Sequence, residues 1–433
     1  MTARFDPRFD PRPAHPARSG AELAVALWGA LTFAALLASY SAFRPVRDAL
    51  ILDGNPDQIP WLFLATFAAV CVASPAWSAL LARRPRRTVV PWAYHASAAC
   101  AVGFFVVMRG HVAPIAVGRV FYVWSAVFNL FIVSVLWSLL ADLLDPETAR
   151  RVYGPIAAGG TVGTFVGPLV TRSLVATIGP AGVLVISALL LELAVLGVHQ
   201  LRRAAAALPA GPAPRGPDAP SGGGAFTGIA GVVRSPFLST IVGYVLCTSF
   251  AATFLYLQQA HIVHDAISDR AARTEYFATI DLWVSVAALI LQTVIARPAL
   301  GALGVGAVLA ILPVLQLAGL SVLAAVPSLT VLAAVQIAGR SATHGLTRPA
   351  RELLFTAVSP DDKYRAKHAI DLIGYRFGDL AASWLEAGLT AIGGAGAMIG
   401  AAIPLVAIWI GCATLLGAGF RRRITQLSRK EPS

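Results

Sequence analysis

Two short segments of the sequence place arginine, proline and an acidic residue in the same order. They are RPVRDAL, from Arg44 to Leu50, and RPARELL, from Arg348 to Leu354. Each stands at the end of a long apolar run, where a charged side chain is expensive to bury. A guanidinium group presents a planar fork of donors that suits phosphate and carboxylate oxygens. The two segments therefore predict a site for an anion.

Helical spacing gathers the charges of each segment into a stripe. The first stripe spans about 100° of one helix face and contains Tyr40, Arg44, Arg47 and Asp48. The second spans about 80°, with its acid just beside it, and contains Arg340, His344, Arg348, Arg351 and Glu352. An arginine at the bilayer centre costs roughly 2.5 to 3.5 kcal/mol on insertion scales. We therefore expect both stripes to face water, a partner or a ligand rather than lipid.

The arginines and the histidine of the two stripes are the predicted substrate contacts, and Tyr40, Asp48 and Glu352 are predicted to support them. Two alternative roles remain open for the arginines. They could form ion pairs with the acids four residues along the same helix, or extend to the lipid headgroups. The polar residues predicted to support or gate the site from other apolar runs are Arg119, Asn129, Asp371 and Arg376. Weaker candidates in these runs are Asp142, Asp281, Asp379 and Glu386.

The composition is that of a membrane protein. Of the 433 residues, 57 % are hydrophobic and 13 % are charged, whereas soluble domains carry about 25 % charged residues. A span of the ~30 Å hydrocarbon core needs about 20 apolar residues, and twelve runs of suitable length occur. They are 22–43, 60–82, 89–108, 114–141, 154–178, 181–201, 236–258, 277–296, 301–325, 328–348, 369–391 and 395–419.

The net charge of +12 indicates orientation rather than nucleic-acid binding. Basic residues concentrate in alternate loops and near the C-terminus, and such loops lie in the cytoplasm by the positive-inside rule. Both termini are therefore predicted to be cytoplasmic, in the inner membrane of a bacterium. We expect a monomer whose partners are the bilayer and a small anion, with no nucleic acid.

A linker rich in proline, glycine and alanine, predicted at residues 204–230, divides the chain into two six-helix bundles at 22–203 and 231–420. Residues 1–21 are predicted to be a disordered tail and 421–433 a basic tail. The expected fold is all-α, with twelve transmembrane helices in a major-facilitator-like arrangement and a site at midplane between the bundles. Small-residue faces that allow close helix packing are predicted at Gly159, Gly163 and Gly167, and at Gly374 and Gly378.

Three blocks of sequence resemble the ATP/ADP translocase family of nucleotide exchangers. They are FRPVRDAL, SVLWSLLADLLDPETARRVYGPIAAGG and TRPARELLFTAVSPDDKYRAKHAIDLIGYRFGD. The resemblance implies exchange of a nucleotide or a related phosphorylated anion. The family's substrate-contacting lysines would fall at Arg47 and Arg351, so the charge is kept while the geometry changes. A family glutamate would fall near Ala126, where the chain has no acid.

These observations together predict a secondary-active transporter that moves an organic or phosphorylated anion by alternating access. The resemblance implies exchange, as in an antiporter, while the residues leave exchange and proton coupling both open. The alternative is a transport-inactive membrane sensor or partner-binding protein with the same fold. A membrane enzyme would need a nucleophile, a metal cluster or a carboxylate dyad, and the sequence offers none of these constellations. We accordingly expect no enzyme activity, no metal and no cofactor.

Overall fold

A computed structural model describes residues 16–84, 86–208, 232, 234–359 and 370–430. The described chain is almost entirely helical. The main elements are α1 (Pro16–Leu50), α2 (Ile59–Arg83), α3 (Arg86–Arg109), α4 (Pro114–Leu143), α5 (Pro146–Ala206), α7 (Pro236–Ala266), α8 (Arg270–Ile290), α9 (Ala296–Ala325), α10 (Leu329–Ala342), α11 (Arg348–Leu354) and α13 (Gly378–Lys430). Short helical segments join some of them. The 3-10 turns are η1 (Ile51–Asp53), η2 (Pro56–Gln58) and η5 (Phe355–Ala357), and the wider π-helical turns are η3 (Leu291–Ile295), η4 (Thr343–Thr347) and η6 (Ile370–Phe377).

Eight helical stretches in the described part of the chain are long and apolar enough to cross a membrane. Two of them, Pro146–Ala206 and Arg270–Ala325, have 61 and 56 residues, enough for two crossings each. Their backbones break at Gly179 and Gly304, where positive φ angles of 71° and 77° interrupt the helix. Two predicted spans remain. One consists of α10, η4 and α11 together, and the other is the N-terminal part of α13. The twelve-helix, all-α membrane fold is therefore confirmed.

Three predicted boundaries differ from the helices. Helix α1 begins at Pro16, so the tail expected to be disordered through residue 21 is helical over its last six residues. Helix α5 continues to Ala206 through the strongly helix-forming sequence RRAAA, and α13 continues through the basic segment to Lys430. The apolar run marks the part of the helix that crosses the membrane, whereas residues of high helix propensity extend the helix beyond that run. Most of the predicted linker lies outside the described residues.

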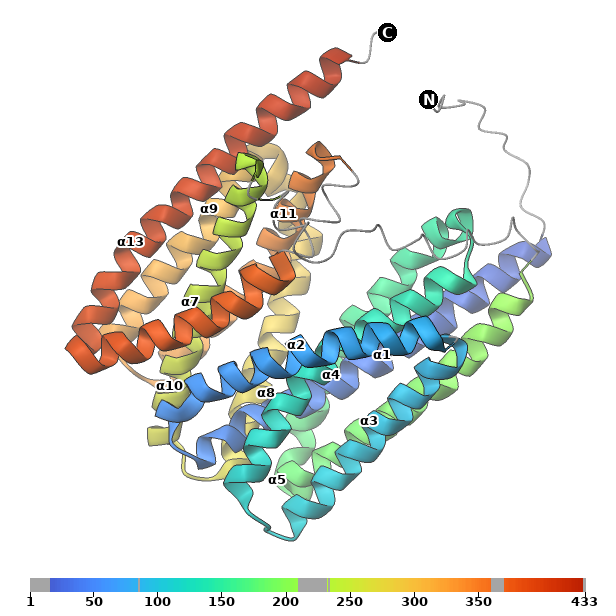
Figure 1. The fold of residues 1–433 in the computed structure, drawn as a ribbon, viewed down its shortest axis with the longest axis horizontal. Helices are drawn as coiled ribbons and strands as arrows, with labels where there is room; N and C mark the ends of the chain where they lie inside the picture. Colours follow the sequence, from blue (N-terminus) through green and yellow to red (C-terminus); the bar gives the residue numbers. More distant parts are fainter. Residues whose placement is uncertain (1–15, 85, 209–231, 233, 360–369, 431–433) are drawn as a thin grey trace.

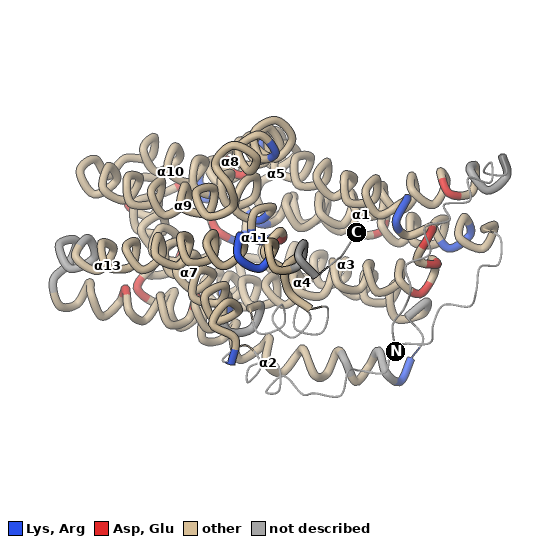
Figure 2. Tube along the Cα trace, turned by 90° about the horizontal axis from the view of Figure 1, so that it is seen from above, with Lys and Arg blue, Asp and Glu red and all other residues tan. Residues whose placement is uncertain are grey.

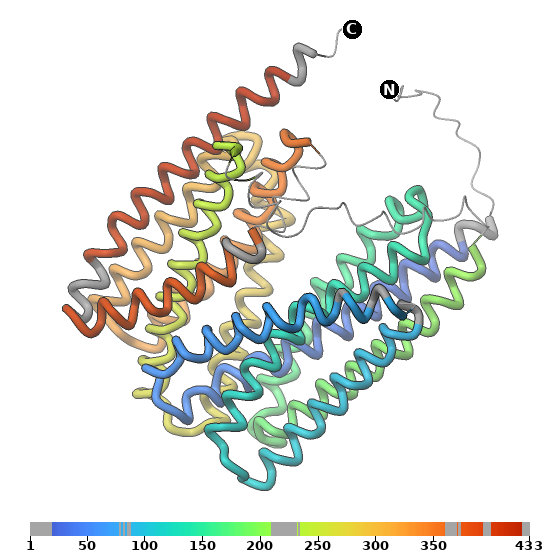
Figure 3. Tube along the Cα trace, viewed as in Figure 1, coloured from blue at the N-terminus to red at the C-terminus, as the bar shows by residue number. Residues whose placement is uncertain are grey.

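The helices form two groups, α1–α5 and α7–α13 (Figure 1). The groups come together at one end and separate at the end where α1 begins and α13 ends, as the chain trace also shows (Figure 3). They meet where α8 packs against α1 and α5, and where α13 packs against α2. Charged residues are sparse along the length of the helices (Figure 2). The few charges between the two groups are therefore conspicuous.

The predicted glycine face of α5 is the surface that packs on α1. A Cβ atom at Gly159 would lie 2.2 Å from the Ala30 carbonyl oxygen, and one at Gly163 would lie 2.3 Å from that of Ala34. Because such distances are impossible for real atoms, glycine is required for this backbone approach. The contact fixes the position of α1, which carries the first arginine segment.

The second group of helices contains wide π-helical turns. These are η3, η4 and η6, and the described part of the first group has no such turn. Segment η4 directly precedes the second arginine segment, and η6 leads into α13. Wide turns of this kind occur frequently at functional sites because they re-aim side chains.

Candidate functional site

A cavity of about 390 Å³ lies between the two groups of helices. Side chains of α1, α2 and α4 line it from one group, and side chains of α7, α8, α9, α10, η4, α11, η6 and α13 line it from the other. Its described charged lining consists of Arg44, Arg47, Arg340, Arg348, Arg376, Asp48, Asp281 and Asp379. Five arginines against three aspartates leave a formal excess of two positive charges, which favours an anionic occupant.

The carboxylate of Asp281 joins arginines from both groups. On α10, Arg340 Nη2 donates to Asp281 Oδ1 over 2.5 Å. On α1, Arg44 Nε lies 3.9 Å from Asp281 Oδ2. Asp281 itself, on α8, is only 7 % exposed. One buried carboxylate thus lies between two guanidinium groups that stand about 300 residues apart in the sequence, 44 to 340.

The other charges of the first segment form a second set of contacts. Arg47 donates to Asp48 Oδ1 from Nε at 2.9 Å and from Nη2 at 2.6 Å. The Tyr256 hydroxyl on α7 donates to the same oxygen at 3.2 Å, so this contact also connects the two groups. The guanidinium carbon of Arg47 lies 5.1 Å from the centre of the Tyr122 ring, a cation–π distance.

The second segment is positioned differently. Arg348 and His344 line the cavity. Arg351 does not appear among the lining residues, and its Nη1 donates to the Tyr375 hydroxyl over 2.5 Å within its own helix group. Glu352 is exposed. The structure therefore brings Arg348, but not Arg351, to the same cavity as Arg44 and Arg47.

The predicted supporting residues divide in the same way. Tyr40, Asn129 and Arg376 line the cavity. Arg119 lies apart from it and donates to the side-chain oxygen of Gln58, in the turn between α1 and α2. The side chain of Asp371 lies outside the described part of the structure.

Two of the weaker candidates from the sequence, Asp281 and Asp379, prove to line the cavity. The sequence could indicate both residues, because a carboxylate inside an apolar run suggests a functional site. What the sequence lacked was the partner of each. Hydroxyl groups of Ser249 and Thr253 on α7 contact Asp379, and an amide pair, Gln336 to Gln259 at 2.7 Å, lies in the same lining.

The turn that follows the first segment contacts the other helix group. Arg270 Nη2 lies 2.5 Å from Asp53 Oδ2, and Arg273 Nη1 donates to the Leu52 carbonyl oxygen over 2.9 Å. His264 Nδ1 contacts the same carbonyl at 2.9 Å. We call these contacts of residues 52 and 53 with α7 and α8 the inter-group latch. It lies where the two helix groups come together, whereas they separate at the other end (Figure 1).

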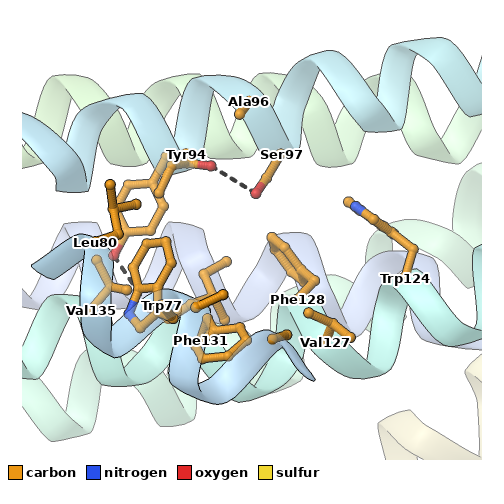
Figure 4. A pocket seen from close by; sticks show the side chains of 14 residues that line it. Trp77, Leu80, Tyr94, Ala96, Ser97, Trp124, Val127, Phe128, Phe131 and Val135 are labelled. Carbon is orange, nitrogen blue, oxygen red and sulfur yellow. Dashed lines mark hydrogen bonds between the residues drawn. The ribbon is translucent and has the colours of Figure 1, made fainter. Parts of the chain in front are cut away.

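A second cavity, of about 400 Å³, lies within the first group of helices, between α2, α3 and α4 (Figure 4). Trp77, Trp124 and Phe131 are among its lining residues. No charged residue lines it in the described chain, and the Ser97 hydroxyl is already bonded to the Ala93 carbonyl at 2.8 Å. An anion would find no partner there, so the charged cavity is the candidate site.

Comparisons with known proteins identify the fold. No family model and no curated protein matches the sequence. Solved structures do match. They include a nucleoside transporter, NupG, at 16 % identity and a TM-score of 0.55, over 93 % of this chain and 99 % of that one.

Two further structures match over nearly their whole length. A bacterial homologue of the iron transporter ferroportin in an inward-facing state has 14 % identity and a TM-score of 0.60, over 94 % of this chain and 98 % of that one. The human organic anion transporter MFSD10 has 13 % identity and a TM-score of 0.56, over 90 % and 99 %. At such identities the likeness establishes the fold alone. The chain is a multi-pass membrane protein with a major-facilitator-like fold.

Proposed function

We propose that this chain is a secondary-active transporter that carries an organic or phosphorylated anion through the charged cavity. The observation that carries the proposal is the sharing of Asp281 by Arg44 of one helix group and Arg340 of the other. During alternating access the two helix groups must separate and come together again, and here a carboxylate joins them. A substrate anion could take the place of that carboxylate.

Asp281 presents to these arginines the kind of group that a substrate anion would present. It offers two oxygens to Arg340 and Arg44, as a substrate phosphate or carboxylate would. An incoming anion gains charge-assisted hydrogen bonds from the same guanidinium groups. Arg47 and Arg348, which line the same cavity, add positive charge around it. The substrate would therefore compete with the protein's own carboxylate, which favours release on either side.

The rest of the lining suits an organic anion. Binding pockets for small molecules occupy roughly 300–1,000 Å³, so a cavity of about 390 Å³ favours a compact molecule such as a mononucleotide or a sugar phosphate. Aromatic side chains from both groups offer faces for an apolar ring; they are Tyr40, Phe63, Tyr122, Tyr256 and Phe277. The resemblance to nucleotide exchangers makes a nucleotide, moved by exchange, the specific form to test first.

The direction of opening follows from the charge of the loops. With both termini in the cytoplasm, as the positive-inside rule predicts, the separated end of the helices faces the cytoplasm and the latch faces outward. The conformation would then be inward-facing. We propose the bacterial inner membrane as its location.

The test combines binding and transport. Purified protein is screened by thermal shift against inorganic phosphate, AMP, ADP, glucose 6-phosphate and succinate, and reconstituted protein is tested for uptake of labelled AMP. We expect at least one anion to stabilise the wild type, and Arg340→Ala to lose that stabilisation. The matched control is Arg202→Ala, an arginine outside the cavity lining. Anion binding that survives Arg340→Ala would contradict the site. Binding without any uptake would favour the alternative function, a transport-inactive membrane sensor.

A further inference from the structure

The three aspartates that line the cavity have chemically different partners. Asp48 faces Arg47, and Asp281 faces Arg340 and Arg44. A guanidinium group can only donate hydrogen bonds, so it satisfies a carboxylate in its ionised form. Each of these two aspartates therefore has a guanidinium partner that can only donate to it.

Asp379, at the start of α13, faces hydroxyl groups instead. The Ser249 hydroxyl donates to its Oδ1, and the Thr253 hydroxyl lies 3.2 Å from the same oxygen. No Arg, Lys or His nitrogen of the described chain is within ion-pair distance of this carboxylate. A hydroxyl can donate or accept, so these partners can satisfy either protonation state of Asp379.

The Ser249 hydroxyl has a second hydrogen-bond acceptor within reach. Its proton therefore has an acceptor whether Asp379 is ionised or protonated. Its Oγ lies 3.2 Å from the carbonyl oxygen of Tyr375, in the wide helical segment η6. When Asp379 is ionised, the Ser249 proton points to the carboxylate. When Asp379 is protonated, the acid donates to Ser249 and the serine proton turns to the Tyr375 carbonyl. One arrangement of heavy atoms thus holds the group with or without its proton.

The charged surroundings of Asp379 are mixed. Arg376 of η6 is the cation that interacts with it through space, and the Tyr375 hydroxyl is bonded to Arg351 of α11. Tyr256 of α7 and Tyr122 of α4 line the same cavity. None of these groups fixes Asp379 in one state by direct contact, unlike the guanidinium partners of the other two aspartates.

We propose that Asp379 is a proton-binding site and that its proton moves together with the transported anion. The inference rests on the proposed function, because a coupled proton needs a substrate to drive. A neutral Asp379 raises the formal excess of positive charge in the cavity from two to three, so proton and anion favour each other's binding. Such coupling is reciprocal by thermodynamic necessity. A proton gradient would then accumulate the anion.

The first experiment needs no substrate. Infrared difference spectra of the purified protein are recorded between acid and neutral pH. We expect a carboxylic-acid C=O band that appears on acidification in the wild type and is lost in Asp379→Asn. It should shift in Ser249→Ala and remain in Glu147→Gln, which removes an exposed acid at the start of α5. A wild-type spectrum identical to that of Asp379→Asn would overturn the proton site.

The second experiment measures coupling in proteoliposomes with labelled AMP. We expect an inward proton gradient to increase accumulation several-fold in the wild type. Asp379→Asn should lose that stimulation, so that its accumulation of AMP is the same with and without the gradient, whatever its rate of uptake. Unchanged gradient-driven accumulation in Asp379→Asn, or accumulation driven by sodium and indifferent to protons, would overturn the inference.

The two experiments separate the two proposals. A titrating Asp379 band in a protein that binds and transports no anion would end the proposed function and keep the proton site. Anion transport without any Asp379 band would do the reverse. Should Asp379→Asn fail to fold, Asp379→Glu retains a carboxylate, and a shifted but present band with altered proton stimulation is the expected result.

Discussion

The two arginine segments share a sequence pattern but not a structural role. The first lies within the continuous helix α1, and its Arg44 and Asp48 contact residues of the other helix group. The second follows the wide turn η4, and its Arg351 contacts Tyr375 within its own group. The first segment therefore bridges the two groups, whereas the second mainly secures one of them. Repetition of a motif predicts equivalent helix positions, but not equivalent contacts.

The largest predicted difference concerns anion affinity. Arg44→Ala removes a guanidinium group from the cavity lining, and with it a hydrogen bond to a charged group that is worth about 1.5–3 kcal/mol. We expect affinity to fall by about 100-fold. Arg351→Ala, which alters a contact outside the cavity lining, should lower it by only about threefold. Equal losses in a titration of both variants would contradict the distinction.

The next prediction concerns the helix that holds the first segment in place. Gly163→Ala would put a Cβ atom 2.3 Å from the Ala34 carbonyl oxygen, and overpacking of this kind costs about 1–3 kcal/mol. We expect a clear fall in the melting temperature in detergent. The matched control is Gly154→Ala on the same helix, where a Cβ would meet nothing within 4 Å. A control that melts as early as Gly163→Ala would contradict the packing argument.

A third prediction tests the inter-group latch, which only the first segment leads into. Asp53→Asn weakens its contacts with Arg270 and Arg273, so the closed end should open more often. We expect about a tenfold faster reaction of Gln259→Cys with an impermeant maleimide added to cells, equivalent to about 1.4 kcal/mol. The native cysteines are first replaced by serine. Labelling as slow as in the parent would show that these ion pairs do not hold the end closed.

The smallest predicted effects come from the acids of the two segments. Asp48→Asn removes a charge that occupies Arg47, so Arg47 becomes available to the anion and affinity should rise by about threefold. Glu352→Gln changes an exposed side chain, and surface substitutions usually alter stability by less than about 0.5 kcal/mol. We expect its affinity and melting temperature to match the wild type. Weaker binding by Asp48→Asn would mean that Asp48 orients Arg47 rather than competing for it.

The membrane architecture could be predicted from the sequence because it depends on local properties. The length of an apolar run fixes whether it can cross the bilayer. The sequence accordingly predicts the two spans joined at Gly179 as separate runs, 154–178 and 181–201. The small-residue face of α5 and the grouping of Arg44, Arg47 and Asp48 on one face of α1 also follow from helical periodicity. Each of these features can be assigned without knowing which helix is the neighbour.

The sequence by itself thus determined which residues are membrane-embedded and which share a helix face. Only the tertiary structure decided that Asp281 pairs with Arg44 and Arg340, that Asp379 meets two hydroxyls, and that Arg351 turns to Tyr375. The physical reason is that these contacts join different helices. They depend on the rotation, depth and tilt at which the helices pack, and a periodic pattern within one helix does not encode those quantities.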